Sequence, residues 1–334
     1  MTRASRSGGT KVGALKRTWM GGTAGYLLAR NLAFKHAPAA ANALMRLTNI
    51  SGRGRGRDGS EAVPYFRGVA EDYEVIARAA GVAESRGSIF AGKRVLEVGP
   101  GNTQAIAMVA RARGALHASG WDAFDVVSRD RAYLNAIYEP LLDAIGDEGS
   151  PARVIELLGE CRVHATRAQL EKQAPFDLVI SRAVLEHVRD LETLHRDLAA
   201  LTTDDAVVIH KVDLRSHGHQ LTHDLDFLLF SDRAWNGLTT HIGEPNRARF
   251  PRYFEIGERH GFRTLYAAST RVISRSEAER IRPRLALPYR DMSPDVLSVL
   301  GFWVVQVKPG HPLASRAIHP ESLQPAPHDA LAPF

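Results

Sequence analysis

Short, mainly apolar runs alternate with longer amphipathic segments through the middle of the chain. The runs 95–98, 178–180 and 206–212 predict strands that are buried on both faces. Segment 190–201 repeats leucine at helical spacing, which predicts an amphipathic helix between two of these strands. This alternation of strand and helix predicts an α/β fold with a doubly wound, mostly parallel sheet and helices on both faces.

Weaker patterns extend the same fold in both directions. Further strands are expected at 115–121, at about 262–268 and at 301–307, and helices at 64–83, 250–260 and 276–282. Leucine, tyrosine and phenylalanine occur at mixed helical spacing between Trp19 and Leu47, which predicts an N-terminal helical extension.

The composition along the chain divides it into three parts. We expect a basic, partly disordered N-terminal extension at 1–60, one domain at 61–308 and a proline-rich tail without fixed structure at 309–334. The glycine–arginine repeat from Gly52 to Arg57 is expected to be a solvated linker.

The charge is uneven. Residues 1–57 contain eleven lysines and arginines and no acidic residue, whereas the remainder has 32 basic and 37 acidic side chains. A mildly acidic domain argues against a sequence-specific nucleic-acid surface. The basic extension suits a helix packed on the domain, a targeting segment or a helix at an anionic membrane surface.

Composition also limits the chemistry and the location. The single cysteine, Cys161, excludes an internal disulfide framework and a multi-cysteine zinc site. Because no run of eighteen apolar residues occurs, we expect a cytoplasmic protein, with peripheral membrane contact through the basic extension as the further option.

Candidate chemistry is concentrated after the first predicted strand. Glu97 lies near the end of that strand, and Gly99 and Gly101 form a turn before a helix. Asp122 follows about twenty residues later, at the spacing from which a carboxylate can bind ribose hydroxyls. Gln104 occupies the position of the third glycine in a dinucleotide fingerprint, and no Gly-Lys-Ser/Thr follows, so neither a dinucleotide nor a triphosphate fits well.

The segment from Lys93 to Thr103 resembles motif I of class I S-adenosylmethionine (SAM) methyltransferases, and Phe176 to Val188 resembles the fourth strand and following turn of the same family. The resemblance implies a Rossmann-like sheet of seven strands, with lid insertions at about 214–250 and 271–300. It also implies a set of cofactor-binding residues. Glu97, Gly99, Pro100, Gly101 and Asn102 would lie near the methionine end, Asp122 at the ribose and Ser181 beside the cofactor.

Two histidines are candidates for a catalytic base, because an imidazole can accept a proton near neutral pH. They are His187, after the fourth strand, and His217, after the fifth. Some family members hold a divalent cation with a Glu-x-x-Glu-His run. Here Ala183 replaces the first carboxylate before Glu186 and His187, so no metal is predicted.

The sequence therefore predicts a SAM-dependent methyltransferase that acts on a hydroxyl or amine of a small-molecule, sugar or lipid-linked acceptor. One alternative is a nucleic-acid methyltransferase, but the Asn/Asp-Pro-Pro-aromatic motif of amino-methylating enzymes is replaced here by Ser181–Val184, and Cys161 follows Glu160 rather than proline. The other alternative is a non-catalytic protein that binds SAM.

Overall fold

The structure is a computed structural model, and it describes residues 7–37, 59–84, 87–123, 127–128, 130–217, 222–239, 244–319, 321 and 323–327. Contacts divide the chain into two units. The sheet unit comprises Gly52–Leu214, Ala248–Ile273 and Val299–Phe334. The helical unit comprises Met1–Ser51, Arg215–Arg247 and Ser274–Ser298. The predicted linker from Gly52 to Arg57 lies outside the described residues.

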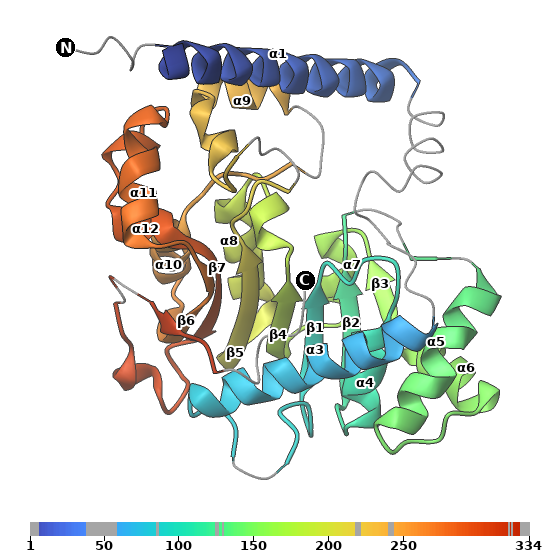
Figure 1. The fold of residues 1–334 in the computed structure, drawn as a ribbon. Coiled ribbons are helices and arrows are strands. Elements are labelled where there is room, and N and C mark those ends of the chain that lie inside the picture. The colour runs from blue at the N-terminus through green and yellow to red at the C-terminus, as the bar shows by residue number, and fades with distance from the viewer. Residues whose placement is uncertain are drawn as a thin grey trace. The chain divides into compact units, whose positions relative to one another are not determined.

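The sheet unit contains one sheet of eight strands in the order β3-β2-β1-β4-β5-β7-β6-β8 (Figure 1). The strands are β1 (Arg94–Val98), β2 (His117–Trp121), β3 (Arg162–His164), β4 (Phe176–Arg182), β5 (Thr202–Asp213), β6 (Arg263–Val272), β7 (Val299–Val307) and β8 (Gln324–Pro325). The five neighbouring strands β3, β2, β1, β4 and β5 run parallel, while β7 is antiparallel to its neighbours β5 and β6. The doubly wound, mostly parallel fold is confirmed.

The eighth strand corrects the predicted number of seven. It comes from the proline-rich segment, where β8 pairs with β6 through Ala268 and Gln324. A short 3-10 turn, η5 (Ala314–Arg316), precedes it. The segment after Lys308 was expected to lack fixed structure, and for its described residues that expectation is wrong. Besides β8, backbone hydrogen bonds from Gly310 to Asp204 and from Ile318 to Thr264 hold the segment. Proline is tolerated at the edge of a sheet.

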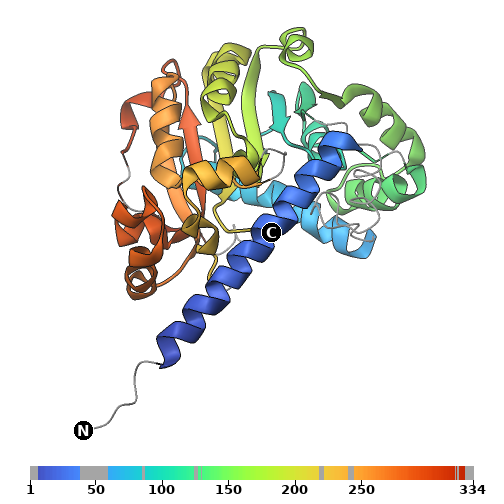
Figure 2. The ribbon, with the colours of Figure 1, turned by 90° about the horizontal axis from the view of Figure 1, so that it is seen from above.

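Helices cover both faces of the sheet (Figures 1 and 2). On one face lie α3 (Gly59–Ala79), α4 (Ala105–Ala112), α5 (Arg131–Ala144) and α6 (Pro151–Glu160). On the other lie α7 (Arg167–Glu171), α8 (Leu191–Leu201) and α10 (Phe250–Arg259), and a 3-10 turn η1 (Leu185–His187) follows β4.

Several helices begin where the sequence supplies a capping side chain. The Asp130 carboxylate accepts the Tyr133 N–H at the start of α5, and Asp190 accepts the Thr193 N–H at the start of α8. Ser150 caps α6, whose first residue is proline. Each cap satisfies a backbone N–H that has no partner within the helix, which typically stabilises it by about 1 kcal/mol.

The alternation of side chains along β1 decides which group faces which layer. Val95 packs in the core beneath α3, α4 and α5, and Glu97, two residues later, faces the same layer. Glu97 is in register with Ile180 of β4, whereas Val98 is in register with Ser181. The central strand therefore presents one carboxylate toward α3 and α4.

The helical unit contains the long helix α1 (Ser7–His36) and short elements. These are η2 (Asp226–Leu229), α9 (Asp232–Leu238), α11 (Arg275–Ile281), η3 (Arg282–Arg284), η4 (Tyr289–Asp291) and α12 (Pro294–Ser298). Among the described residues, no helix is both long and apolar enough to cross a membrane.

Arg247 organises the helical unit from its interior. Its guanidinium is buried between the rings of Trp235 and Tyr289, at 5.3 and 5.0 Å from their centroids. It donates to the carbonyl of Phe230 at 2.6 Å and to the Asp232 carboxylate. Although charged residues usually lie at the surface, this arginine is only 3% exposed.

Arg249, two residues later, connects two ends of the sheet-unit chain by hydrogen bonds. This buried arginine donates to the carbonyl of Leu214 at 3.0 Å and to that of Val299. Leu214 is the last residue before the segment 215–247, and Val299 is the first after the segment 274–298. Segment 215–247 thus begins, and segment 274–298 ends, directly beside a residue whose carbonyl accepts a hydrogen bond from Arg249.

Candidate functional site

The turn after β1 depends on glycine for two different reasons. Gly99 and Gly101 have φ angles of +71° and +72°, a region that side chains with a Cβ rarely enter. A Cβ on Gly99 would also lie 2.3 Å from Cγ2 of Val184, in the loop after β4. A Cβ on Gly101 would meet no described atom within 4 Å, so the space beside Gly101 is open.

Hydrogen bonds fix this turn to the neighbouring elements. The Gly99 N–H donates to the carbonyl of Trp121 at the end of β2, at 2.8 Å. The Asn102 side chain donates to the Tyr133 hydroxyl at 3.1 Å, and the Gln104 N–H donates to the Tyr138 hydroxyl at 3.0 Å. Gln104, at the position of the missing third glycine, therefore connects the turn to α5. Neither tyrosine was identified from the sequence.

Glu97 is a buried carboxyl group directly beneath the turn. Burial raises its pKa to about 8, against the lowering effect of the Ala107 N–H, and the negative charge of Asp122 raises it further. Among the described residues, no hydrogen-bond partner reaches its buried Oε2 atom. A buried carboxyl oxygen without a partner is costly, so this position suits a cationic or hydrogen-bond-donating ligand group.

Asp122 lies at the carboxyl end of β2, next to the glycine turn. Its N–H donates to the carbonyl of His164 at the end of β3, at 3.1 Å. Its charge reaches Glu97, because each parallel strand ends at the same edge of the sheet. The structure thus brings together Glu97, the Gly99–Asn102 turn and Asp122, as the sequence predicts for a nucleoside site at this edge.

Ser181 is placed differently from the other predicted cofactor residues. Its fully buried hydroxyl makes a 2.7 Å hydrogen bond with Nδ1 of His210 in β5. His210 faces α8, where its ring centroid lies 6.4 Å from that of His195. The Ser181 side chain is therefore engaged inside the sheet unit, on the face opposite Glu97. This geometry gives no support to a contact between its hydroxyl and the cofactor.

A buried ionic cluster that was not identified from the sequence lies under α3, next to the end of β4. Arg182 donates to the Asp72 carboxylate at 2.7 Å, and Nζ of Lys211 lies 4.0 Å from the same oxygen. Arg182, Lys211 and Trp303 are in register on adjacent strands. The ring of Trp303 lies under both cations, at 5.9 and 5.4 Å.

The backbone after this cluster is strained. Ala183 has a φ of +53°, which costs an alanine about 1 kcal/mol or more. Its N–H donates to the Lys211 carbonyl at 2.8 Å, and the next residue, Val184, is the one that approaches Gly99. The Asp72–Arg182 ion pair thus lies directly before a strained residue, and the residue after that one packs against the glycine turn.

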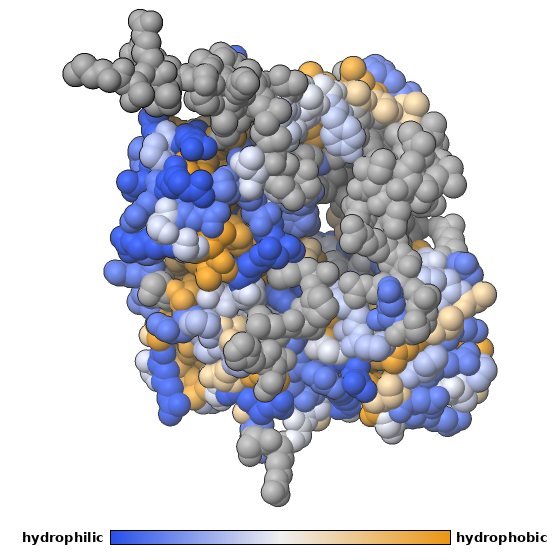
Figure 3. Space-filling view, in the orientation of Figure 1, coloured by the Kyte–Doolittle hydropathy of each residue, from blue (hydrophilic) through white to orange (hydrophobic). Residues whose placement is uncertain are grey.

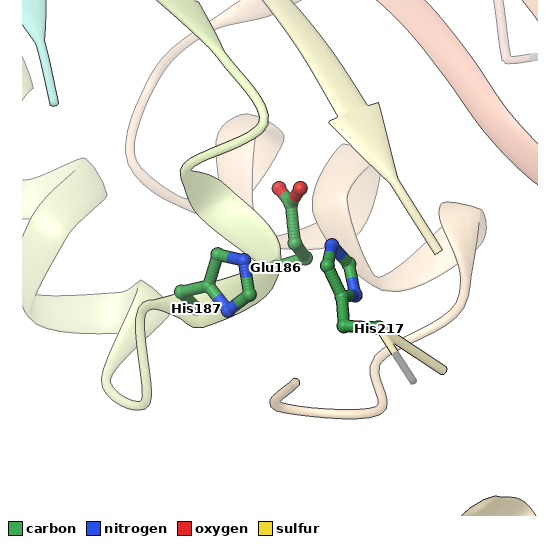
Figure 4. A group of neighbouring side chains, drawn as sticks. All are labelled: Glu186, His187 and His217. Carbon is green, nitrogen blue, oxygen red and sulfur yellow. The ribbon is translucent and has the colours of Figure 1, made fainter. Parts of the chain in front are cut away.

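The two predicted catalytic histidines lie in different units. Figure 4 shows Glu186 and His187 on η1, after β4, and His217 on the segment that follows β5. His217 has a φ of +51°, and its Nδ1 makes a 2.9 Å hydrogen bond with the Arg215 carbonyl. Whether His187 and His217 act at one acceptor stays a prediction.

The chain matches the family described as "Methyltransferase domain" over residues 71–264, which is more than half of its length. It belongs to this methyltransferase family. The resemblance to class I SAM-dependent methyltransferases is thereby confirmed, and the family implies SAM as the methyl donor. No curated protein matches the chain.

Solved structures with the same type of fold are distant from this methyltransferase. A SAM-dependent methyltransferase from Mesorhizobium loti is 15% identical, covering 71% of this chain and 100% of that chain with a TM-score of 0.39. A TehB-like SAM-dependent methyltransferase from Corynebacterium glutamicum is 14% identical, covering 80% and 96% with a TM-score of 0.35. A phosphoethanolamine N-methyltransferase from Haemonchus contortus, solved with SAM, is 15% identical, covering 72% and 52% with a TM-score of 0.39.

Proposed function

We propose that this methyltransferase transfers the methyl group of SAM to a hydroxyl or amine of a small-molecule, sugar or lipid-linked acceptor. The observation that carries the proposal is the open turn at Gly101 beside the buried Oε2 atom of Glu97. SAM has a cationic amino group but no phosphate, so a carboxyl group and exposed backbone suit it better than an anion site does.

The residues at the edge of the sheet fit the cofactor in order. Glu97 and the backbone of Gly99–Asn102 would hold the methionine end, and Asp122 would hold the ribose hydroxyls. When bound, SAM supplies a methyl group that is already electrophilic. The protein therefore has to orient the acceptor atom and exclude water from it.

A hydroxyl or amine acceptor must lose a proton, and His187 and His217 are our candidates to receive it. A positioned base typically contributes about 10²- to 10⁴-fold to the rate. We expect that His187→Ala or His217→Ala lowers kcat by such a factor while the affinity for the cofactor changes little. His311→Ala, at a half-buried histidine in the C-terminal segment, is the matched control. Unchanged turnover in both variants would remove the base assignment.

Cofactor binding is tested by calorimetric titration with S-adenosylhomocysteine (SAH), with NAD as the competing candidate. We expect heat from SAH alone. Asp122→Asn should weaken SAH about tenfold or more, since a hydrogen bond to a charged group contributes about 1.5–3 kcal/mol. Asp205→Asn, at an exposed residue near the amino end of β5, should leave the affinity unchanged. Heat from NAD with none from SAH would contradict the proposal.

The acceptor class is tested by methyl transfer from isotopically labelled SAM into fractions of a cell extract. Label in lipid, sugar or small metabolites supports the proposal. Label in RNA or DNA would instead support a nucleic-acid methyltransferase, against which the excess of acidic residues after position 57 argues. SAH binding without any transfer would indicate a non-catalytic SAM-binding protein.

A further inference from the structure

Helix α1 uses one face to pack within the helical unit (Figures 1 and 2). Leu27 is fully buried, the ring centroid of Trp19 lies 6.0 Å from that of Phe230, and Asn31 donates to the carbonyl of Leu238 in α9. Residues 19, 27 and 31 are eight and four positions apart, so they lie on one side of the helix. This side is the one that contacts α9.

The opposite side of α1 is exposed although it is apolar. Leu28 and Leu32, one helical turn apart, are 50% and 56% exposed. The exposed positions described between Met20 and Ala33 are Gly21, Gly22, Gly25, Tyr26, Leu28, Ala29, Leu32 and Ala33. None of them is charged. A surface helix normally directs polar residues to solvent, so the described exposed positions of this helix show the opposite pattern.

Apolar residues also reach the molecular surface near α1. In Figure 3 hydrophilic residues cover much of the described surface, and orange residues occur in small groups, including at the upper edge where Figure 1 draws α1. Three of the large exposed apolar side chains of the described chain belong to α1, namely Tyr26, Leu28 and Leu32. Leu28 and Leu32 share one exposed face of the helix, and such an exposed apolar pair indicates an interaction surface.

The charge of this part of the chain indicates the partner. Residues 1–57 contain eleven lysines and arginines without one acidic residue, and α1 itself contains five of these cations. A second copy of the same helix would bring two acid-free segments together, which is electrostatically unfavourable. An anionic surface attracts such a segment, with each basic residue near an anionic lipid surface adding about 1 kcal/mol.

We propose that α1 binds the surface of an anionic lipid bilayer, with Leu28 and Leu32 inserted at the boundary between headgroups and acyl chains. Insertion of the exposed leucines would remove apolar area from water, and the basic residues of the same segment are attracted to anionic lipids. The proposal does not depend on the nature of the methyl acceptor. It assigns a lipid-binding surface to a part of the chain that the methyltransferase family match does not cover.

The test is co-sedimentation of the full chain with vesicles of phosphatidylcholine alone and of phosphatidylcholine mixed with phosphatidylglycerol. We expect binding to the mixed vesicles only, and weaker binding as the salt concentration rises. The double variant Leu28→Ser/Leu32→Ser should bind the mixed vesicles about tenfold less well or worse. Leu116→Ser/Ile155→Ser removes two apolar side chains of the sheet unit that are more exposed, at 68% and 67%, and this variant should bind like the wild type.

Several results would overturn the proposal. They are the absence of binding to mixed vesicles, equal binding to both kinds of vesicle, and unchanged binding of the Leu28→Ser/Leu32→Ser variant. A dimer of the wild type that this variant dissociates, without vesicle binding, would show that a second copy covers the face. Thermal unfolding and SAH titration of each variant verify that the fold is retained, so loss of lipid binding is separated from loss of cofactor binding.

Discussion

The glycine turn allows a steric effect to be separated from a backbone effect within three residues. Gly99→Ala and Gly101→Ala both place a side chain at a φ near +70°. That conformation should cost each variant about 1–2 kcal/mol of unfolding free energy. Only Gly99→Ala also creates contacts, at 2.3 and 2.8 Å from the two methyl carbons of Val184. Overpacking of this kind adds about 1–3 kcal/mol, so Gly99→Ala should be the more destabilising change.

Val184→Ala isolates the steric contribution, because it removes the side-chain atoms that a Cβ on Gly99 would contact most closely. It removes both methyl carbons and leaves Cβ, which would lie 3.1 Å from a Cβ on Gly99. In a double-mutant cycle measured by urea unfolding, Gly99→Ala and Val184→Ala should therefore couple favourably by about 1–2 kcal/mol. Gly101→Ala paired with Val184→Ala should be additive within about 0.5 kcal/mol.

Ligand affinity gives the second readout of the same variants. If the cofactor occupies the open space beside Gly101, Gly101→Ala should weaken SAH about tenfold or more although it costs less stability than Gly99→Ala. Equal destabilisation by the two alanine variants, or additivity of Gly99→Ala with Val184→Ala, would refute the packing argument. Unchanged SAH affinity of Gly101→Ala would refute the assignment of the open space to the cofactor.

Three further predictions follow from buried groups. Because the pKa of Glu97 is about 8 without ligand, its carboxyl group is mostly protonated at pH 7. Pairing with the ammonium group of the ligand favours the carboxylate, so SAH binding should release up to about one proton. Calorimetry should detect this proton as a buffer-dependent binding enthalpy, and Glu97→Gln should abolish that dependence. Burial lowers the pKa of His210 from 6.5 to about 3, so below pH 6.5 the unfolded state binds a proton that the folded state excludes. The free energy of unfolding should therefore fall as the pH drops below about 6.5, by up to about 1.4 kcal/mol per pH unit. His210→Gln should flatten this pH dependence in urea unfolding. Arg249→Ala should lower the free energy of unfolding by about 2–5 kcal/mol, because it leaves two buried carbonyls without their donor. The control Arg252→Ala, at a partly exposed surface arginine, should cost about 1 kcal/mol or less. Equal shifts of the thermal unfolding temperature in the two variants would contradict this prediction.

The central strands and the turn were predictable because their signals are local. The mainly apolar runs before Gly99 and Ser181 predict buried strands, and a glycine pair after such a run predicts the turn. Parallel strands end at one edge of the sheet, so the proximity of Glu97 and Asp122 follows from strand order alone. For these residues, the physical rules need no information from distant parts of the chain.

The supporting contacts were not predictable in the same way. Asp72 and Arg182 are 110 positions apart, and neither has a sequence context that distinguishes a buried ion pair from two solvated charges. The orientation of Ser181 was missed for another reason. A strand buried on both faces has no alternation of polar and apolar residues, so the pattern does not reveal which face a given side chain occupies. The short edge strand β8 carries too little hydrophobic signal to be recognised.

The local glycine motif and the long-range contacts that support it meet at Val184. This is why the local motif alone does not define the site. The turn needs glycine at position 99 because of a side chain that comes from the loop after β4. That loop holds its strained conformation at Ala183 beside an ion pair whose carboxylate, Asp72, comes from α3. A substitution in α3 can therefore change the shape of the turn without touching it. We accordingly expect the residues that support the turn to affect SAH affinity through its geometry, and Glu97 and Asp122 to affect it through direct interaction.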